Sequence, residues 1–356
     1  MQIDGVRTSA YWKSLFSSPD FFLWRFDGSD ALFVEMNRHS YNQSIFTDQR
    51  IVAASDAVVR IPIEELLAAQ KKYSSNGNKA SHFIFHMAHT GSTLYARALD
   101  IEEKNIVYRE PAALRQLAVY CSGGAWPGEA PQDAAAVLEV TLALLARRYN
   151  HSGAAIIKAN VPVNFILPQL LASPHCSRAI MLHSTLEDYL LAILKSDSHR
   201  GWLARIIEEM GTAIDRLLDT DATVRAQLTD AQRATCLWLA QHSCFAEALQ
   251  SDQNRSLDAE DWFAKPKRSL AHSFHFFQQK IARPHIEKIT ASSLFTQHAK
   301  ADQHSYSNRQ RLEEKAQRRE ALQQQISDAR RWVEQRQPEV MDQSALPHPL
   351  LIPNKS

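Results

Sequence analysis

The chain has 356 residues, of which 45% are hydrophobic and 22% are charged, a composition typical of a globular protein with a sizeable core. Its formal net charge of +1 argues against a nucleic-acid partner bound through a broad basic face. No apolar run approaches the roughly 20 residues that span a bilayer, and the first residues do not resemble a signal peptide. We therefore expect a cytoplasmic protein with no membrane partner and no nucleic-acid partner.

The four cysteines, Cys121, Cys176, Cys236 and Cys244, lie far apart in the sequence. They form no C-x-x-C pair, and no group of histidines and cysteines has the spacing of a zinc site. We expect reduced thiols and no metal.

Residues 1–78 are expected to form a small N-terminal region that contains a hairpin. In "FFLWRFDGSDALFVEM", Asp27-Gly28 separates two apolar, aromatic-rich runs, which is a strong hairpin signal. "RIPIEELLAAQKK" then predicts a short helix with proline near its start. "YSSNGNKAS" has the composition of a linker.

Residues 79–290 are expected to form an α/β domain. Short apolar runs, "HFIFHMA", "NIVYREP", "GAAIIKAN" and "SRAIMLHS", alternate with helical segments, which indicates a parallel sheet with helices on both faces. Residues 196–250 are expected to be a helical insertion, and "NRSLDAEDWF" a last strand. The fold class is therefore α/β, with a parallel sheet flanked by helices.

Residues 291–356 are expected to form a helical C-terminal extension and an irregular, proline-containing tail. A polar helix should open with a capping box at Ser307–Gln310 and run to about Gln337. Its sparse apolar residues predict a solvated helix laid over the edge of the domain, and pairing with another chain is the alternative.

The segment "FIFHMAHTGSTLYARALD" places a small polar loop between a strand and a helix. Such a loop lies at the carboxyl edge of a parallel sheet, where the first turn of the helix has unpaired N–H groups. Gly91 lets the backbone approach an anion, and the hydroxyls of Ser92 and Thr93 add donors. We predict a phosphate or sulfate site at Thr90–Thr93. The alternative is that Thr90 or Ser92 only caps the helix and Gly91 only forms a turn.

This loop is not a regular G-x-x-x-x-G-K-[ST] phosphate loop. Aligned on Gly91, the loop has Ser92 at the position of the lysine and no glycine at the position of the first glycine. Because the lysine that contacts the β and γ phosphates is missing, an ordinary ATPase is disfavoured.

The same segment resembles the 5′-phosphosulfate-binding loop of the sulfotransferases. "YREPAALRQLA", "AIIKANVPVNFILPQLL", "SRAIMLHSTLEDYLLAILKS" and "SLDAEDWFAKPKRSLAHSFHFF" are similar to later segments of bacterial sulfotransferase-like proteins, so the resemblance covers about 80 to 280. It implies a P-loop type α/β fold and 3′-phosphoadenosine 5′-phosphosulfate as the sulfuryl donor, with a hydroxylated small molecule or peptide as the acceptor.

Three positions depart from that family's pattern. His89 stands where members usually carry arginine or lysine in the first loop. His183 and Leu191 stand where an arginine and a serine usually hold the 3′ phosphate of the donor. A neutral imidazole donates one hydrogen bond but brings no fixed charge, so the fold carries over more readily than the donor.

Glu110, at the end of a strand beside the loop, is the candidate general base, by position and by resemblance. The alternative is a carboxylate paired with Arg109 or Arg115. Lys158 ends the next strand and is a candidate to stabilise the bridging oxygen, the alternative being a solvated lysine. Asp258 is expected to anchor a helix N-terminus.

Three hypotheses follow. The first is a sulfotransferase-like enzyme, and the second is a nucleotide-binding phosphotransferase with another donor. The third is a catalytically silent nucleotide-binding protein of the same fold, which the histidine replacements permit.

Overall fold

The computed structural model describes residues 7–74, 80–150, 153–298, 301–305, 308–336 and 345–351. Its centre is a five-stranded sheet of order β5-β6-β4-β7-β8, in which all neighbours are parallel. The strands are β4 (Ser81–His86), β5 (Asn105–Arg109), β6 (Ala154–Lys158), β7 (Cys176–His183) and β8 (Asn254–Asp258). The predicted α/β class is confirmed.

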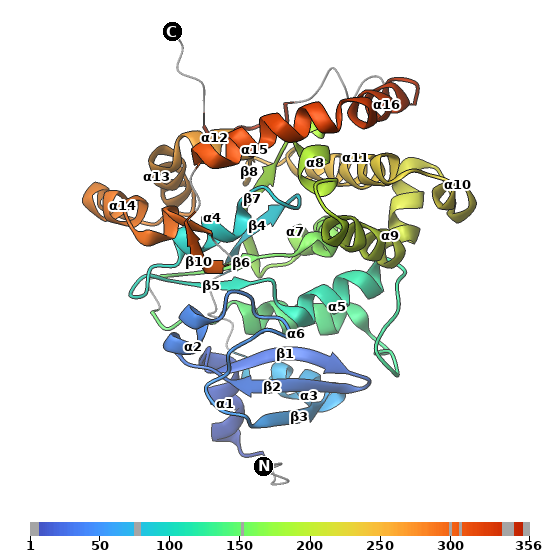
Figure 1. Cartoon of the computed structure of the whole chain (residues 1–356). Coiled ribbons are helices and arrows are strands. Elements are labelled where there is room, and N and C mark those ends of the chain that lie inside the picture. The colour runs from blue at the N-terminus through green and yellow to red at the C-terminus, as the bar shows by residue number, and fades with distance from the viewer. Residues whose placement is uncertain are drawn as a thin grey trace.

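Helices cover both faces of this sheet (Figure 1). Neighbouring residues of β4 point to opposite sides, so that Phe83 lies in one hydrophobic cluster and Ile84 in another. Because both faces are covered, β4, β5 and β6 are buried along their whole length. The flanking helices include α4 (Ser92–Leu99), α5 (Ala112–Cys121), α6 (Ala134–Leu145), α7 (Leu167–Ala172) and α8 (Leu186–Ile193), with a 3-10 turn, η1 (Val161–Ile166), before α7.

The N-terminal region is a three-stranded antiparallel sheet of β1 (Phe21–Asp27), β2 (Asp30–Glu35) and β3 (Val58–Pro62). The predicted hairpin is confirmed, and its turn is Gly28-Ser29, with Gly28 at φ +58°. The short helix predicted over "RIPIEELLAAQKK" is correct only from Ile63, since α3 is Ile63–Tyr73 and Arg60–Pro62 belong to β3. β3 forms because it pairs with β2, and a pairing with a distant strand cannot be seen in a local sequence pattern. Helices α1 (Ser9–Ser17) and α2 (Arg38–Gln43) complete the region.

The helical insertion consists of α9 (Asp197–Leu218), α10 (Ala222–Ala226) and α11 (Asp230–Ala248). Thr229 opens α11 with a capping box to Gln232. The predicted last strand is β8, and it is followed by α12 (Ala259–Ala264), α13 (Pro266–Phe276) and α14 (Arg283–Thr290). A short 3-10 turn, η2 (Ser293–Phe295), leads to a small hairpin of β9 (Gln297–His298) and β10 (Ala301–Ser305).

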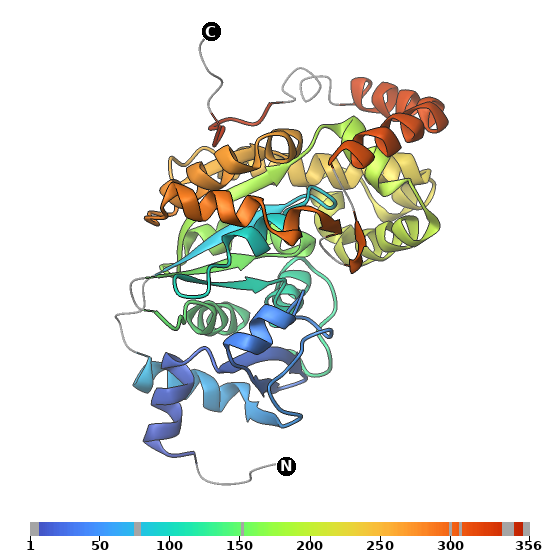
Figure 2. The same cartoon turned by 60° about the vertical axis from the view of Figure 1, so that its left-hand side comes forward.

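The predicted C-terminal helix is two helices, α15 (Asn308–Ala321) and α16 (Gln323–Glu334). They part at Leu322, which is buried together with Ile326, Ala329 and Val333 of α16. The expectation of a solvated helix over the domain edge therefore holds for α15, which buries no described residue, and not for α16. Ser307 of the predicted capping box lies outside the described residues. Figures 1 and 2 show α15 and α16 at one end of the molecule and the N-terminal sheet at the other.

A buried arginine joins the N-terminal region to the central sheet. Arg109, at the end of β5, is 2% exposed and donates to Asp100 at 2.6 Å and to the carbonyl oxygen of Ser44 at 2.6 Å. Arg38 donates to the other oxygen of Asp100 at 2.7 Å. Burial lowers the pKa of Arg109, which Asp100 opposes. Asp100 therefore balances two cations at the junction.

Replacing Asp100 by alanine should lower the free energy of unfolding by about 3–5 kcal/mol, because it leaves a buried guanidinium without its counter-ion. Asp30→Ala, at a more exposed pair with Arg60, should cost less than about 1 kcal/mol. Urea unfolding followed by circular dichroism measures both. Equal losses for the two variants would contradict a structural role of Asp100.

Candidate functional site

The loop between β4 and α4 has two residues in the left-handed region, His89 at φ +64° and Gly91 at φ +73°. The hydroxyl of Thr90 donates to the carbonyl oxygen of Met87 at 2.8 Å, which closes the loop on itself. A Cβ at Gly91 would lie 2.4 Å from the ring of Phe263. Glycine is therefore required both by the backbone conformation and by the ring packed against it.

The first turn of α4 holds donors without acceptors. Gly91 is the N-cap, and no side chain caps this helix. Ser92 and Thr93 are 5% and 4% exposed, and no hydrogen bond from either hydroxyl is found among the described residues. The buried indole nitrogen of Trp262 has no hydrogen-bond partner among the described residues. It lies 3.2 Å from the position that a Cβ of Gly91 would take. The alternative in which Thr90 or Ser92 caps the helix does not hold. Grouped N–H and O–H donors suit an anion.

His89 is the exposed residue of this loop. Its ring lies beside α9, with a centroid distance of 4.6 Å to His199 and of 6.1 Å to Trp202. The helical insertion therefore borders the loop through two aromatic side chains that the sequence did not connect with it.

His183 ends β7 and is 7% exposed, with its Nδ1 4.0 Å from Asp258 Oδ2. Burial lowers the pKa of His183 to about 4, and the neighbouring His242 adds to the effect. Asp258 stands at 4.0 Å, too far for a close pair, so burial determines the charge state. His183 is a neutral residue at neutral pH. Leu191, on α8, is 2% exposed and belongs to the core.

Glu110 and Lys158 meet at the carboxyl edge of the sheet. The register of β5 and β6 pairs Arg109 with Lys158, and the Glu110 N–H donates to the Lys158 carbonyl oxygen at 2.7 Å. The Lys158 ammonium forms an ion pair and hydrogen bond with Glu110 Oε1, and His86 Nε2 lies 3.8 Å from the same oxygen. Lys158 is 1% exposed, so the alternative in which it is a solvated lysine is wrong.

The backbone of Glu110 is itself unusual. Its φ of +59° is in the left-handed region, which costs a non-glycine residue roughly 1–3 kcal/mol and is frequent at functional sites. The pairing of Glu110 with Arg109 or Arg115 is wrong, since those arginines bind Asp100 and Glu209.

A segment of the N-terminal region lies over this pair. The Phe46 ring has the Lys158 ammonium 5.4 Å and the Arg50 guanidinium 3.9 Å from its centroid. The Thr47 N–H donates to the Arg109 carbonyl oxygen at 2.7 Å. Sequence reasoning missed Phe46, Arg50 and His86, because only the tertiary structure brings residues 46–50 to the sheet edge.

Asp258 is the N-cap of α12, accepting from the N–H groups of Glu260 at 2.8 Å and Asp261 at 3.2 Å. This confirms its expected anchoring role. Burial raises the pKa of its carboxyl.

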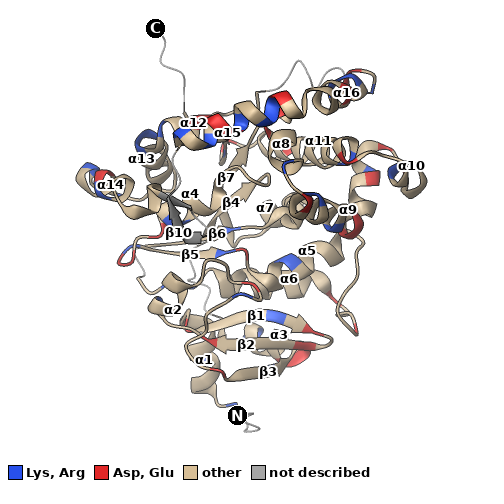
Figure 3. Cartoon of the chain, viewed as in Figure 1, with Lys and Arg blue, Asp and Glu red and all other residues tan. Residues whose placement is uncertain are grey.

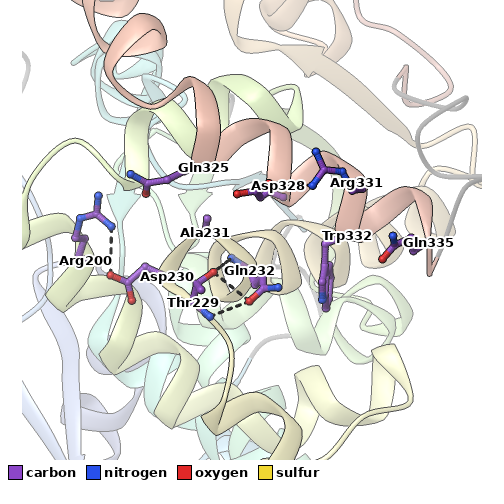
Figure 4. A pocket seen from close by; sticks show the side chains of 11 residues that line it. Arg200, Thr229, Asp230, Ala231, Gln232, Gln325, Asp328, Arg331, Trp332 and Gln335 are labelled. Atoms are coloured by element: carbon purple, nitrogen blue, oxygen red, sulfur yellow. Dashed lines mark hydrogen bonds and ion pairs between the residues drawn. The ribbon is translucent and has the colours of Figure 1, made fainter.

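A groove of about 600 Å³ lies between α16 and α11 (Figure 4). Its polar lining is largely paired internally: Arg200 binds Asp230, and Thr229 binds Gln232. The described residues contain no group of three His, Cys, Asp or Glu side chains suited to a metal. All four cysteines are free thiols. None of the described helices has the length and apolarity to cross a membrane.

No protein-family model and no curated protein matches the chain. A crystal structure of a sulfotransferase from Alicyclobacillus acidocaldarius is similar, with 13% sequence identity and a TM-score of 0.36 over 60% of this chain and 90% of that chain. A similarity this remote does not assign the chain to a family.

His183 should make stability depend on pH. The unfolded chain binds a proton at this residue near pH 6.5, and the folded chain only near pH 4. Its contribution to stability is therefore full above pH 6.5 and is lost as the pH falls toward 4, by about 3 kcal/mol at most. His183→Asn should reduce this loss, whereas His39→Asn, at an exposed site, should not. Urea unfolding between pH 7 and pH 4 tests this, and identical pH profiles for His183→Asn and wild type would contradict it.

Proposed function

We propose that the chain is a sulfotransferase-like enzyme that transfers a sulfuryl group from 3′-phosphoadenosine 5′-phosphosulfate to a hydroxyl of a small molecule or peptide. The observation that carries the proposal is the Glu110–Lys158 ion pair, which adjoins His86 at the end of β4, the strand that leads into the loop. A carboxylate and an ammonium at one sheet edge supply a base and a stabilising cation.

The donor's sulfate and 5′ phosphate bind at Thr90–Thr93, where the free donors of the first turn of α4 are grouped. Glu110 accepts the proton of the acceptor hydroxyl as its oxygen attacks the sulfur. The bond between sulfur and the phosphate oxygen breaks, and adenosine 3′,5′-bisphosphate leaves with the electron pair. Lys158 pairs with Glu110, and its positive charge stabilises the charge that develops on the bridging oxygen.

The buried state of His183 favours a second candidate. With a pKa of about 4, His183 supplies no cation for a 3′ phosphate at neutral pH. A phosphotransferase whose donor has no 3′ phosphate is therefore the second proposal. A catalytically silent nucleotide-binding protein is the third.

A thermal-shift comparison separates these functions. Selective stabilisation by adenosine 3′,5′-bisphosphate supports the sulfotransferase, and stabilisation by ATP supports the phosphotransferase. Bisphosphate binding without release of bisphosphate from the phosphosulfate donor, across a panel of phenols, alcohols and tyrosyl peptides, supports the silent protein. No response to either nucleotide or to sulfate overturns all three.

Ser92→Ala and Thr93→Ala should each weaken binding of adenosine 3′,5′-bisphosphate about ten- to a hundredfold, because each removes a hydrogen bond to a charged group. Thr223→Ala is the control, since Thr223 is an exposed hydroxyl residue in the first turn of α10. Titration calorimetry gives the affinities. Unchanged affinity in both loop variants would end the anion-loop proposal.

Glu110→Gln should lower turnover by about two to four orders of magnitude while donor affinity stays within a few fold, because it keeps the shape and removes the proton acceptor. Glu103→Gln, at an exposed position after α4, is the matched control. Release of bisphosphate with the best acceptor of the panel measures turnover. Full turnover in Glu110→Gln would remove Glu110 from the mechanism.

A further inference from the structure

Helices α13 and α14 enclose a groove of about 870 Å³ on the outside of the domain, which we call the α13–α14 groove. Its rim carries Lys267, Arg268, Lys280 and Arg283, and its floor includes Phe274 and Ile286. The chain turns directly after α13, where the Gln279 N–H donates to the Phe274 carbonyl oxygen at 2.7 Å, and α14 begins at Arg283. The groove is therefore built by one continuous stretch of chain.

Positive charge is concentrated along this stretch. Residues 265–290 contain six lysines and arginines and one acidic residue, Glu287, whereas the whole chain has a net charge of +1. Glu287 pairs with Arg283 at 3.1 Å. Within the described part of the chain, Lys267 and Lys280 form no ion pair, and both are exposed. Figure 3 shows basic residues on both helices.

The floor of the groove is apolar. Phe274 and Ile286 are 1% and 6% exposed, and the lining adds Ala271, Ile281 and Ala282. A recessed apolar floor between cations suits a ligand that has an apolar side chain flanked by carboxylates.

Other anionic partners fit less well. The large exposed hydrophobic residues of the described chain all lie elsewhere, so α13 and α14 offer nothing that inserts into a bilayer. Of the residues that line the groove, His275 is the one exposed aromatic ring, whereas proteins that bind a single nucleic-acid strand stack successive bases on several rings.

We propose that the α13–α14 groove binds an acidic peptide segment of a partner protein, with an apolar side chain on the floor and carboxylates against Lys267 and Lys280. The groove and the Glu110–Lys158 pair belong to different parts of the fold. Glu110 follows β5 at one edge of the sheet, whereas α12 and α13 follow β8 at the other edge. The proposal does not depend on the proposed function.

Fluorescence anisotropy with a fluorescein-labelled peptide of sequence EEDLEEDLEE tests this. Lys267→Glu combined with Lys280→Glu should weaken binding at least about tenfold at low salt, where attraction between exposed charges is least screened. The matched control reverses Lys71 and Lys72, two exposed lysines of α3, and should change affinity less than about twofold. Thermal unfolding verifies that both double variants are folded.

A second pair of measurements tests the floor. Replacing both leucines of the peptide by serine should weaken binding at least about threefold, the order of one lost apolar contact. Ala271→Trp, which fills the groove without changing charge, should weaken binding of the leucine peptide to the same degree. Three results would overturn the proposal: no saturable binding of the peptide, equal losses in the groove and control reversals, or tighter Lys267- and Lys280-dependent binding of phosphatidylserine vesicles or polyuridylate.

Discussion

The pairing of β5 with β6 is the constraint on which the candidate site depends. Parallel register sets Arg109 opposite Lys158, so the residue after Arg109 is held against the end of β6 by a hydrogen bond from its N–H. Glu110 then turns into the left-handed region and forms an ion pair with Lys158. A slip of β5 by one residue against β6 would turn the side chains of β5 to the opposite face and separate Glu110 from Lys158.

The same strand end anchors the N-terminal region. While Glu110 faces Lys158, the side chain of Arg109 binds Asp100 and the carbonyl oxygen of Ser44, and its own carbonyl oxygen accepts from Thr47. Phe46 is thereby held beside the Lys158 ammonium. The N-terminal sheet thus contributes one wall of the candidate site, and the parallel sheet contributes the charged pair.

Charge at the carboxyl edge of β7 and β8 is balanced by α15. Glu260, in the first turn of α12, binds Arg311 and Lys315, and hydrogen bonding by Arg311 lowers the pKa of Glu260 to about 2. Lys315 also pairs with Asp188 in the first turn of α8, at 2.7 Å. Arg311 lies over the Phe263 ring that covers Gly91. This helix therefore neutralises carboxylates close to a loop that has donors but no fixed positive charge of its own.

The sequence by itself determined the parallel α/β core, the hairpin at Asp27-Gly28, the strand-loop-helix at Phe83–Asp100 and the capping role of Asp258. The signals for these features are local. The periodicity of apolar residues, the residues of turns and the capping residues each depend on positions that are close together in the chain. The tertiary structure decided that Glu110 pairs with Lys158 rather than with an arginine, that Phe46 and Arg50 join them, and that His183 is buried and neutral. It also decided the pairing of β3 and the break at Leu322. Strand register, burial and long-range ion pairs join residues tens to hundreds of positions apart, and no local pattern encodes which of several cations or edges a residue will meet.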